Sequence, residues 1–265
     1  MATVASSAAD LQSRERRFYT RMALFLTALV FVGFAPSFYL RGIVPEYPRP
    51  NPTLPPWVIF HGLLFTLWML VFVTQTQLVA AGRRDIHMKL GAASMFLAIA
   101  MIPVMYLTGV WQVVRNNVPP FTTPLDWTAL PLLAMPAFAF LVWQGWKRRR
   151  EAQWHKRLML GAAMVVVLGP SFGRIPLAPP VKALFAVQMI VTLAFFLPLF
   201  IWDKRTLGKT HPATKVAFGT YALATLAAVA LIVSGTWAPI AARLPGLGVS
   251  PAARPSLPIA MTCVG

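Results

Sequence analysis

Residues 57–80 read WVIFHGLLFTLWMLVFVTQTQLVA, a run that contains no Asp, Glu, Lys or Arg. A helix needs about 20 predominantly apolar residues to cross the hydrocarbon core of a bilayer. Inside hydrocarbon the backbone must satisfy its own hydrogen bonds, and a helix does so within one segment. The run therefore predicts a membrane-spanning helix, and the Arg83-Arg84 pair that follows it predicts a return to water.

The composition of the whole chain agrees with this local pattern. The chain has 265 residues, of which 57% are hydrophobic and 12% are charged, with a mean hydropathy of +0.64. A soluble domain carries about 25% charged residues. The net charge of +17 would suggest nucleic acid as a partner of a soluble protein. Here the basic residues form short clusters between apolar runs, so we expect membrane lipids and no nucleic acid as partners.

Seven apolar runs are long enough to be considered as spans, and none of them contains Asp, Glu, Lys or Arg. We predict an all-α integral membrane protein, a seven-transmembrane-helix bundle. The expected spans are residues 22–40, 57–80, 90–111, 127–146, 158–173, 183–202 and 216–236.

Basic residues predict the orientation of the bundle. Connections on the side of the N-terminus hold most of the Lys and Arg, and the richest is the stretch 147–157. Because cytoplasmic loops carry an excess of Lys and Arg, we expect an N-in/C-out topology in a bacterial inner (plasma) membrane. The predicted domains are a cytoplasmic N-terminal segment (1–20), a transmembrane domain (21–236) and a flexible extracytoplasmic tail (237–265).

Short sequence matches suggest repeated helical hairpins. His87-Met-Lys-Leu90 and His155-Lys-Arg-Leu158 each open an expected span, and Pro36-Ser-Phe-Tyr-Leu-Arg-Gly42 matches Pro103-Val-Met-Tyr-Leu-Thr-Gly109. Internal symmetry is common in membrane proteins that arose by duplication. The alternative is that proline and aromatic residues simply favour the ends of spans.

His61 is the histidine that lies within an expected span. With Phe65, Trp68, Phe72 and Gln75 it forms one stripe at helical spacing. An ionisable group inside the membrane is a candidate for function. The stripe combines an imidazole, flat aromatic rings and an amide, so it predicts a face that binds haem or quinone. The alternative is an inward packing face whose histidine is hydrogen-bonded to a neighbour.

Two further groups of polar residues are candidates. At the depth of His61 the chain carries ionisable and polar groups, which would orient a quinone headgroup if they converged. The alternative is that they are interfacial residues whose side chains reach the lipid headgroups. At the opposite interface three histidines would bind a metal, a lipid phosphate or a haem propionate. The alternative is that they simply lie at the starts of their helices. The first group is Arg41, Asp126, Arg174 and Gln188, near Tyr39 and Tyr106; the second is His87, His155 and His211.

The His-x-(Lys/Arg)-Leu starts, together with the earlier His61-Gly62 pair, resemble those of uncharacterised bacterial multi-pass membrane proteins. These are similar to small membrane proteins of haem handling and cytochrome-oxidase assembly. The resemblance covers residues 57–165 and implies that His61, His87 and His155 are the ligands of a metal or haem. The sequence departs from that pattern at Met88, where a basic residue is common.

Three functions are therefore open at this point. The first is a haem- or quinone-associated protein of respiratory or redox assembly, with His61, Trp68, Gln75, Arg41 and Arg174 at the cofactor. The second is a non-catalytic accessory or scaffold subunit, whose partners would be other subunits of a larger membrane complex. The third is an enzyme that acts on a lipid-soluble substrate.

Overall fold

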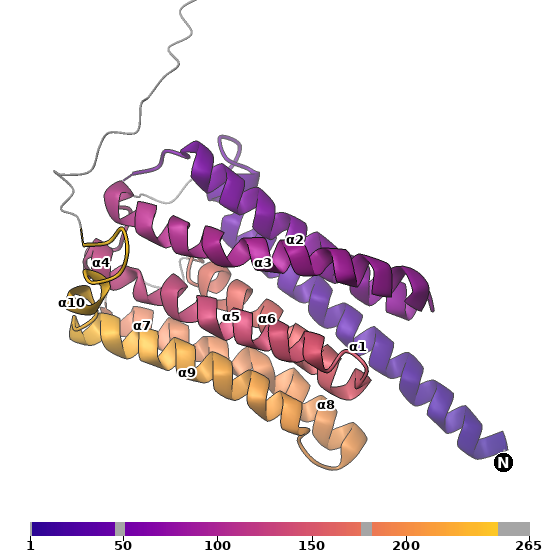
Figure 1. The fold of residues 1–265 in the computed structure, drawn as a ribbon. Coiled ribbons are helices and arrows are strands. Elements are labelled where there is room, and N and C mark those ends of the chain that lie inside the picture. Colours follow the sequence, from indigo (N-terminus) through magenta and orange to yellow (C-terminus); the bar gives the residue numbers. More distant parts are fainter. Residues whose placement is uncertain (1, 46–50, 176–181, 249–265) are drawn as a thin grey trace, which may run out of the picture.

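The computed structural model describes residues 2–45, 51–175 and 182–248. These residues form an elongated bundle of long helices that run up and down along one direction (Figure 1). No β-strand occurs in the described residues, so the prediction of an all-α fold is confirmed for them. The elements are α1 (Ala2–Phe34), η1 (Ala35–Tyr39), α2 (Pro56–Ala80), α3 (Arg84–Arg115), α4 (Pro124–Trp127), α5 (Ala129–Lys147), α6 (Ala152–Phe172), α7 (Lys182–Val191), η2 (Thr192–Phe196), α8 (Leu197–Leu207), α9 (Pro212–Ser234) and α10 (Ala238–Ala241).

Six helical segments are long and apolar enough to cross a membrane, which supports the class of multi-pass membrane protein. The predicted span 158–173 is also helical, as part of α6, but it is not one of these six. Lys156 and Arg157, just before this span in α6, lower the hydropathy of the helix. The six segments are Ala9–Tyr39, Pro56–Ala80, Arg84–Arg115, Pro124–Lys147, Lys182–Leu207 and Pro212–Ser234.

The helix α6 forms the centre of the bundle. Every residue from Leu160 to Leu168 is buried, and the helix packs against α1, α5 and α9. Small residues allow this close approach. A Cβ atom on Gly161 would lie 2.6 Å from the Cβ of Ala217 on α9. A helix enclosed by protein on all sides does not contact lipid. Its hydropathy is therefore a weaker indication of whether it crosses the membrane.

Two helices change their geometry along the bundle. α1 continues into η1, a π-helical segment that contains Pro36. The predicted span 183–202 is divided into α7, the 3₁₀ segment η2 and α8. Pro198 explains the second change, because proline has no N–H to donate and its ring clashes with the carbonyl four residues earlier, here that of Ala194. Leu197 N–H bonds to the Ala194 carbonyl instead, three residues back.

The two ends of the bundle differ in chemistry. We call the end with the turns 81–83, 148–151 and 208–211 the basic end, and the other, with residues 51–55, 116–123 and 235–248, the proline-rich end. The N-terminal part of α1 lies at the basic end, and α4 and α10 lie at the proline-rich end (Figure 1).

The start of the expected tail packs on the bundle, which differs from the expected flexibility. Trp237 is buried and its Nε1 donates to Thr128 Oγ1 at 2.9 Å. Ala238 N donates to Asp126 Oδ1 at 2.7 Å, and Leu247 is also buried. These contacts are long-range, so composition alone did not indicate them. Residues 249–265, with the single cysteine, lie outside the described residues.

Candidate functional site

Two histidines meet at the basic end. His87 lies in the first turn of α3 and His155 in the first turn of α6. Their ring centroids are 6.2 Å apart, and their ring planes are nearly perpendicular, at 81°. Each residue is the histidine of one His-x-(Lys/Arg)-Leu motif, so the fold brings the two copies of that motif together.

The hydrogen bond of His155 defines which of its nitrogens carries the proton. Its Nδ1 lies 2.9 Å from the carbonyl oxygen of Gly145, near the end of α5. Because a carbonyl oxygen only accepts, Nδ1–H is the donor, and a neutral His155 then has its free lone pair on Nε2. This arrangement, in which a carbonyl orients the ring, is common for histidines that bind metals.

The side chain of Gln75 also bonds to a histidine ring, that of His87, but as a donor. In the amide orientation that pairs donors with acceptors, its Oε1 accepts from Gly91 N at 2.8 Å. Its Nε2 donates to the His87 carbonyl at 3.2 Å and to His87 Nδ1 at 2.6 Å. A neutral His87 therefore carries its hydrogen on Nε2. The pair thus combines a ring N–H donor on His87 with a ring acceptor on His155.

A buried ion pair lies close to these histidines along α6. The guanidinium of Arg157 donates to Asp203 Oδ1 through Nε at 3.0 Å and Nη2 at 2.5 Å, and neither side chain is exposed. The second oxygen, Asp203 Oδ2, accepts from His211 N at 2.9 Å and from Thr214 Oγ1 at 2.6 Å. The carboxylate therefore joins α6, α8 and the start of α9.

His211, the third histidine of this end, caps a helix. Its Nδ1 accepts a hydrogen bond from Ala213 N at 3.1 Å, and its ring contacts that of Trp154 edge to face. Burial lowers the pKa of His211 below its ordinary value, and the nearby Arg157 lowers it further. The neutral ring has the lone pair that the cap requires, so this histidine has a local structural role.

His61 lies near the proline-rich end, apart from the other histidines. Its Nδ1 shares a hydrogen bond with Thr108 Oγ1 at 3.2 Å, and its ring stacks on Phe65 at 4.2 Å. The rise of a helix places His61 about 21 Å from Gln75, the neighbour of His87, along the same helix. The expected set of His61, His87 and His155 therefore does not form one metal site.

The stripe that continues from His61 toward the basic end of α2 faces the interior of the bundle. Trp68 is 2% exposed and Phe72 is 9% exposed, and the ring of Trp68 contacts that of Phe138 on α5 edge to face. Protein side chains thus pack against the face on which a flat cofactor was expected. The stripe corresponds to the alternative of an inward packing face.

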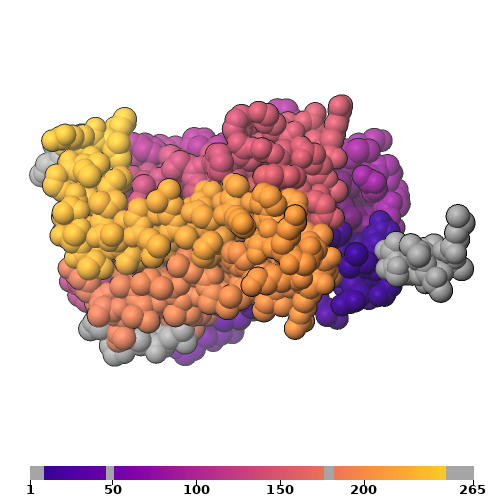
Figure 2. Space-filling view, turned by 90° about the horizontal axis from the view of Figure 1, so that it is seen from below, coloured from indigo at the N-terminus to yellow at the C-terminus, as the bar shows by residue number. Residues whose placement is uncertain are grey.

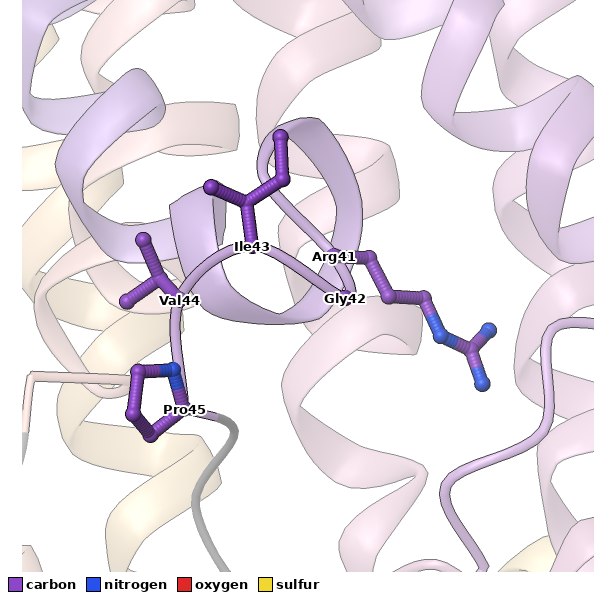
Figure 3. Close-up of a pocket in the computed structure, with 5 residues that line it drawn as sticks. All are labelled: Arg41, Gly42, Ile43, Val44 and Pro45. Atoms are coloured by element: carbon purple, nitrogen blue, oxygen red, sulfur yellow. The ribbon is translucent and has the colours of Figure 1, made fainter.

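Most of the other polar groups near the proline-rich end have hydrogen-bond or ring partners of their own. Arg41 is exposed, and it lines an open hollow of about 740 Å³ with the neighbouring residues of its own turn, from which its side chain points away (Figure 3). The guanidinium of Arg174 lies 4.2 Å from the ring centroid of Phe34 and donates to the Pro170 carbonyl. Gln188 donates to backbone carbonyls, Tyr39 bonds to Thr66, and Tyr106 donates to the Pro245 carbonyl.

Residues 2–45, 51–175 and 182–248 contain no group of three or more His, Cys, Asp or Glu side chains that could hold a metal ion. The ion pair of Arg157 and Asp203 was missed, because Arg157 was interpreted only as an orientation signal. The scarcity of acids was an available signal: the chain has only 7 Asp and Glu against 24 Lys and Arg. Because acids are so few, Asp203, which lies between Trp202 and Lys204, was a candidate partner for a basic residue.

The fold thus defines a helical, multi-pass type of membrane protein with a polar cluster at one end. Comparison with protein-family models, with curated proteins and with solved structures found no match to this chain.

Proposed function

We propose that this chain is a seven-span protein of the bacterial inner membrane, oriented N-in/C-out, that binds a redox cofactor at its basic end. The site consists of His87, His155 and Gln75, and haem is the first candidate. Seven spans place all the basic turns on the cytoplasmic side, as the distribution of Lys and Arg requires.

The distance between the two imidazole rings is the observation that carries the proposal. Two imidazoles on opposite sides of one iron lie about 6 Å apart between ring centres, from two metal–nitrogen bonds of about 2 Å and the radius of each ring. The centroids of His87 and His155 are 6.2 Å apart. Arg84, one turn before His87, and Lys89 provide exposed cations for the haem propionates. Bound haem would supply one-electron transfer.

A quinone is the second candidate, and the Gln75 amide favours it. With Gln75 donating to His87 Nδ1, the hydrogen of a neutral His87 is on Nε2, which suits a hydrogen bond to a quinone carbonyl. Ligation of iron through the same Nε2 requires the reverse, with Nδ1–H donating to Gln75 Oε1 after a turn of the amide. Gln75 therefore distinguishes the two candidates.

Absorption spectroscopy after purification in a mild detergent tests the proposal. We expect a Soret band that is lost in His87→Ala and in His155→Ala but kept in His61→Ala, which removes a histidine from the other end. Gln75→Glu should keep the band, because a carboxylate accepts from Nδ1–H. A quinone protein would instead be colourless, with extractable quinone that Gln75→Glu abolishes. A protein without either cofactor, which co-purifies with fixed partners, would overturn the proposal in favour of an accessory or scaffold subunit.

A further inference from the structure

A separate pocket lies at the basic end between α1 and α8. Its volume is about 400 Å³, and it is lined by Arg14, Arg17, Phe18, Arg21 and Trp202. The four residues of α1 follow the spacing of one helix face, so the three arginines lie above one another beside the same neighbour. Figure 2 shows the N-terminal part of α1 (indigo) beside the adjoining end of the later helices (orange), at the edge of the bundle.

Two aromatic rings line this pocket. Phe18 stacks on Trp202 with ring centroids 4.7 Å apart and planes 11° from parallel. The indole Nε1 of Trp202 is buried and has no hydrogen-bond partner in the described part of the chain. A buried N–H of this kind is normally hydrogen-bonded. Three cations and a stacked aromatic pair therefore line the pocket, and one of the lining side chains carries a buried N–H donor without an acceptor.

The surroundings indicate that a molecule bound in this pocket would be amphipathic. Exposed apolar side chains continue from the pocket along both helices toward the middle of the bundle: Phe25 on α1 is 41% exposed, and Ile201 and Leu197 on α8 are 46% and 56% exposed. Phe25 also contacts Phe195 on η2, the segment that precedes α8. A headgroup in the pocket would thus have its acyl chains against an apolar surface.

We propose that this pocket binds the phosphate of an anionic phospholipid, with the arginines on the phosphate oxygens. Basic pockets between transmembrane helices on the cytoplasmic side suit such headgroups. Guanidinium groups bind phosphate through charge-assisted hydrogen bonds. Of the two acidic residues near this arginine face on α1, Glu15 forms an ion pair with Lys156 of α6. The other, Asp10, lies one turn before Arg14 and is not among the residues that line the pocket.

Native mass spectrometry of the detergent-purified chain, titrated with phosphatidylglycerol, tests this site. Phosphatidylcholine with the same acyl chains is the neutral reference. We expect the first phosphatidylglycerol to bind at least about tenfold more tightly than phosphatidylcholine, given three basic groups at the headgroup. The triple variant Arg14→Gln/Arg17→Gln/Arg21→Gln should bind both lipids equally.

A matched variant, Lys147→Gln/Arg149→Gln/Arg150→Gln, removes the same charge from the same end of the bundle but outside the pocket. It should keep the affinity for the first phosphatidylglycerol within about twofold. Trp202→Phe keeps an aromatic ring beside Phe18 and removes the indole N–H, so its affinity should fall between those of the wild type and the pocket triple. Gel filtration checks that each variant stays folded.

Three outcomes would overturn the site. One is an equal loss in the two triple variants, which would mean a general effect of surface charge. Another is a wild type that does not discriminate between the two lipids. The third is displacement of phosphatidylglycerol by millimolar inorganic phosphate, which would assign the pocket to a free phosphate compound instead.

Discussion

Replacing Asp203 by alanine removes the carboxylate that holds three helices together at the basic end. In the folded protein this group accepts hydrogen bonds from the Arg157 guanidinium, from the Thr214 hydroxyl and from the backbone N–H of His211. Both charged side chains are completely buried. The substitution therefore leaves a buried guanidinium without its counter-ion, and two other donors lose their acceptor.

The expected cost is large. Breaking a buried ion pair by removing one partner destabilises a protein by about 3–5 kcal/mol, because the remaining charge is uncompensated. Each additional buried donor that is left without an acceptor costs about 1–3 kcal/mol. Gln153 still accepts from the guanidinium, which reduces the loss. We therefore expect a decrease of about 4 kcal/mol or more in the free energy of unfolding.

Reversible unfolding in mixed micelles of dodecyl maltoside and SDS, followed by tryptophan fluorescence, measures this change. Asp85→Ala is the matched control, since Asp85 pairs with Arg83 at 3.3 Å while both side chains are more than half exposed. An exposed pair of this kind contributes little to stability. The double variant Arg157→Met/Asp203→Leu should regain most of the lost stability, because it leaves no unpaired charge. Equal effects of the two aspartate substitutions would refute the reasoning.

Two further predictions concern α9. Gly161→Val should reduce stability by about 1–3 kcal/mol, because the added atoms collide with Ala217, whereas Gly219→Ala, which has open space around it, should not; thermal unfolding compares the two. Because the pKa of His211 is lowered, the unfolded chain binds more protons than the folded protein below about pH 6.5, so stability falls as the pH decreases from that value. His211→Asn, a helix cap that does not titrate, should flatten this dependence in a pH series of melting curves, and an unchanged slope would exclude His211 as the cause.

The positions of helices were largely predictable, with instructive exceptions. Residues 57–80 were expected to be one span, and α2 covers Pro56–Ala80. The 3₁₀ segment at Thr192–Phe196 was not expected, although Pro198 was a signal for a change of helical geometry just before it. The packing of Trp237 was not predictable from composition, because its partner Thr128 is far away in the sequence.

The candidate sites were less predictable than the helices. His61 was expected to be at the centre of function, and the structure adds its hydrogen bond to Thr108 on α3, which the sequence did not predict. Asp203, which was not among the expected site residues, is an acceptor for three different groups. A helical stripe shows which side chains share a face of one helix, but it does not show which helix covers that face.

The amino-acid sequence by itself determined which segments are helical and which end of the bundle is basic. Both properties are local: a segment in hydrocarbon satisfies its own backbone, and a turn carries its own charges. Only the tertiary structure decided that His87 meets His155, that Arg157 pairs with Asp203, and that α6 occupies the centre. These outcomes depend on which helices become neighbours and how each is rotated, and small residues such as Gly161 control how closely the helices approach.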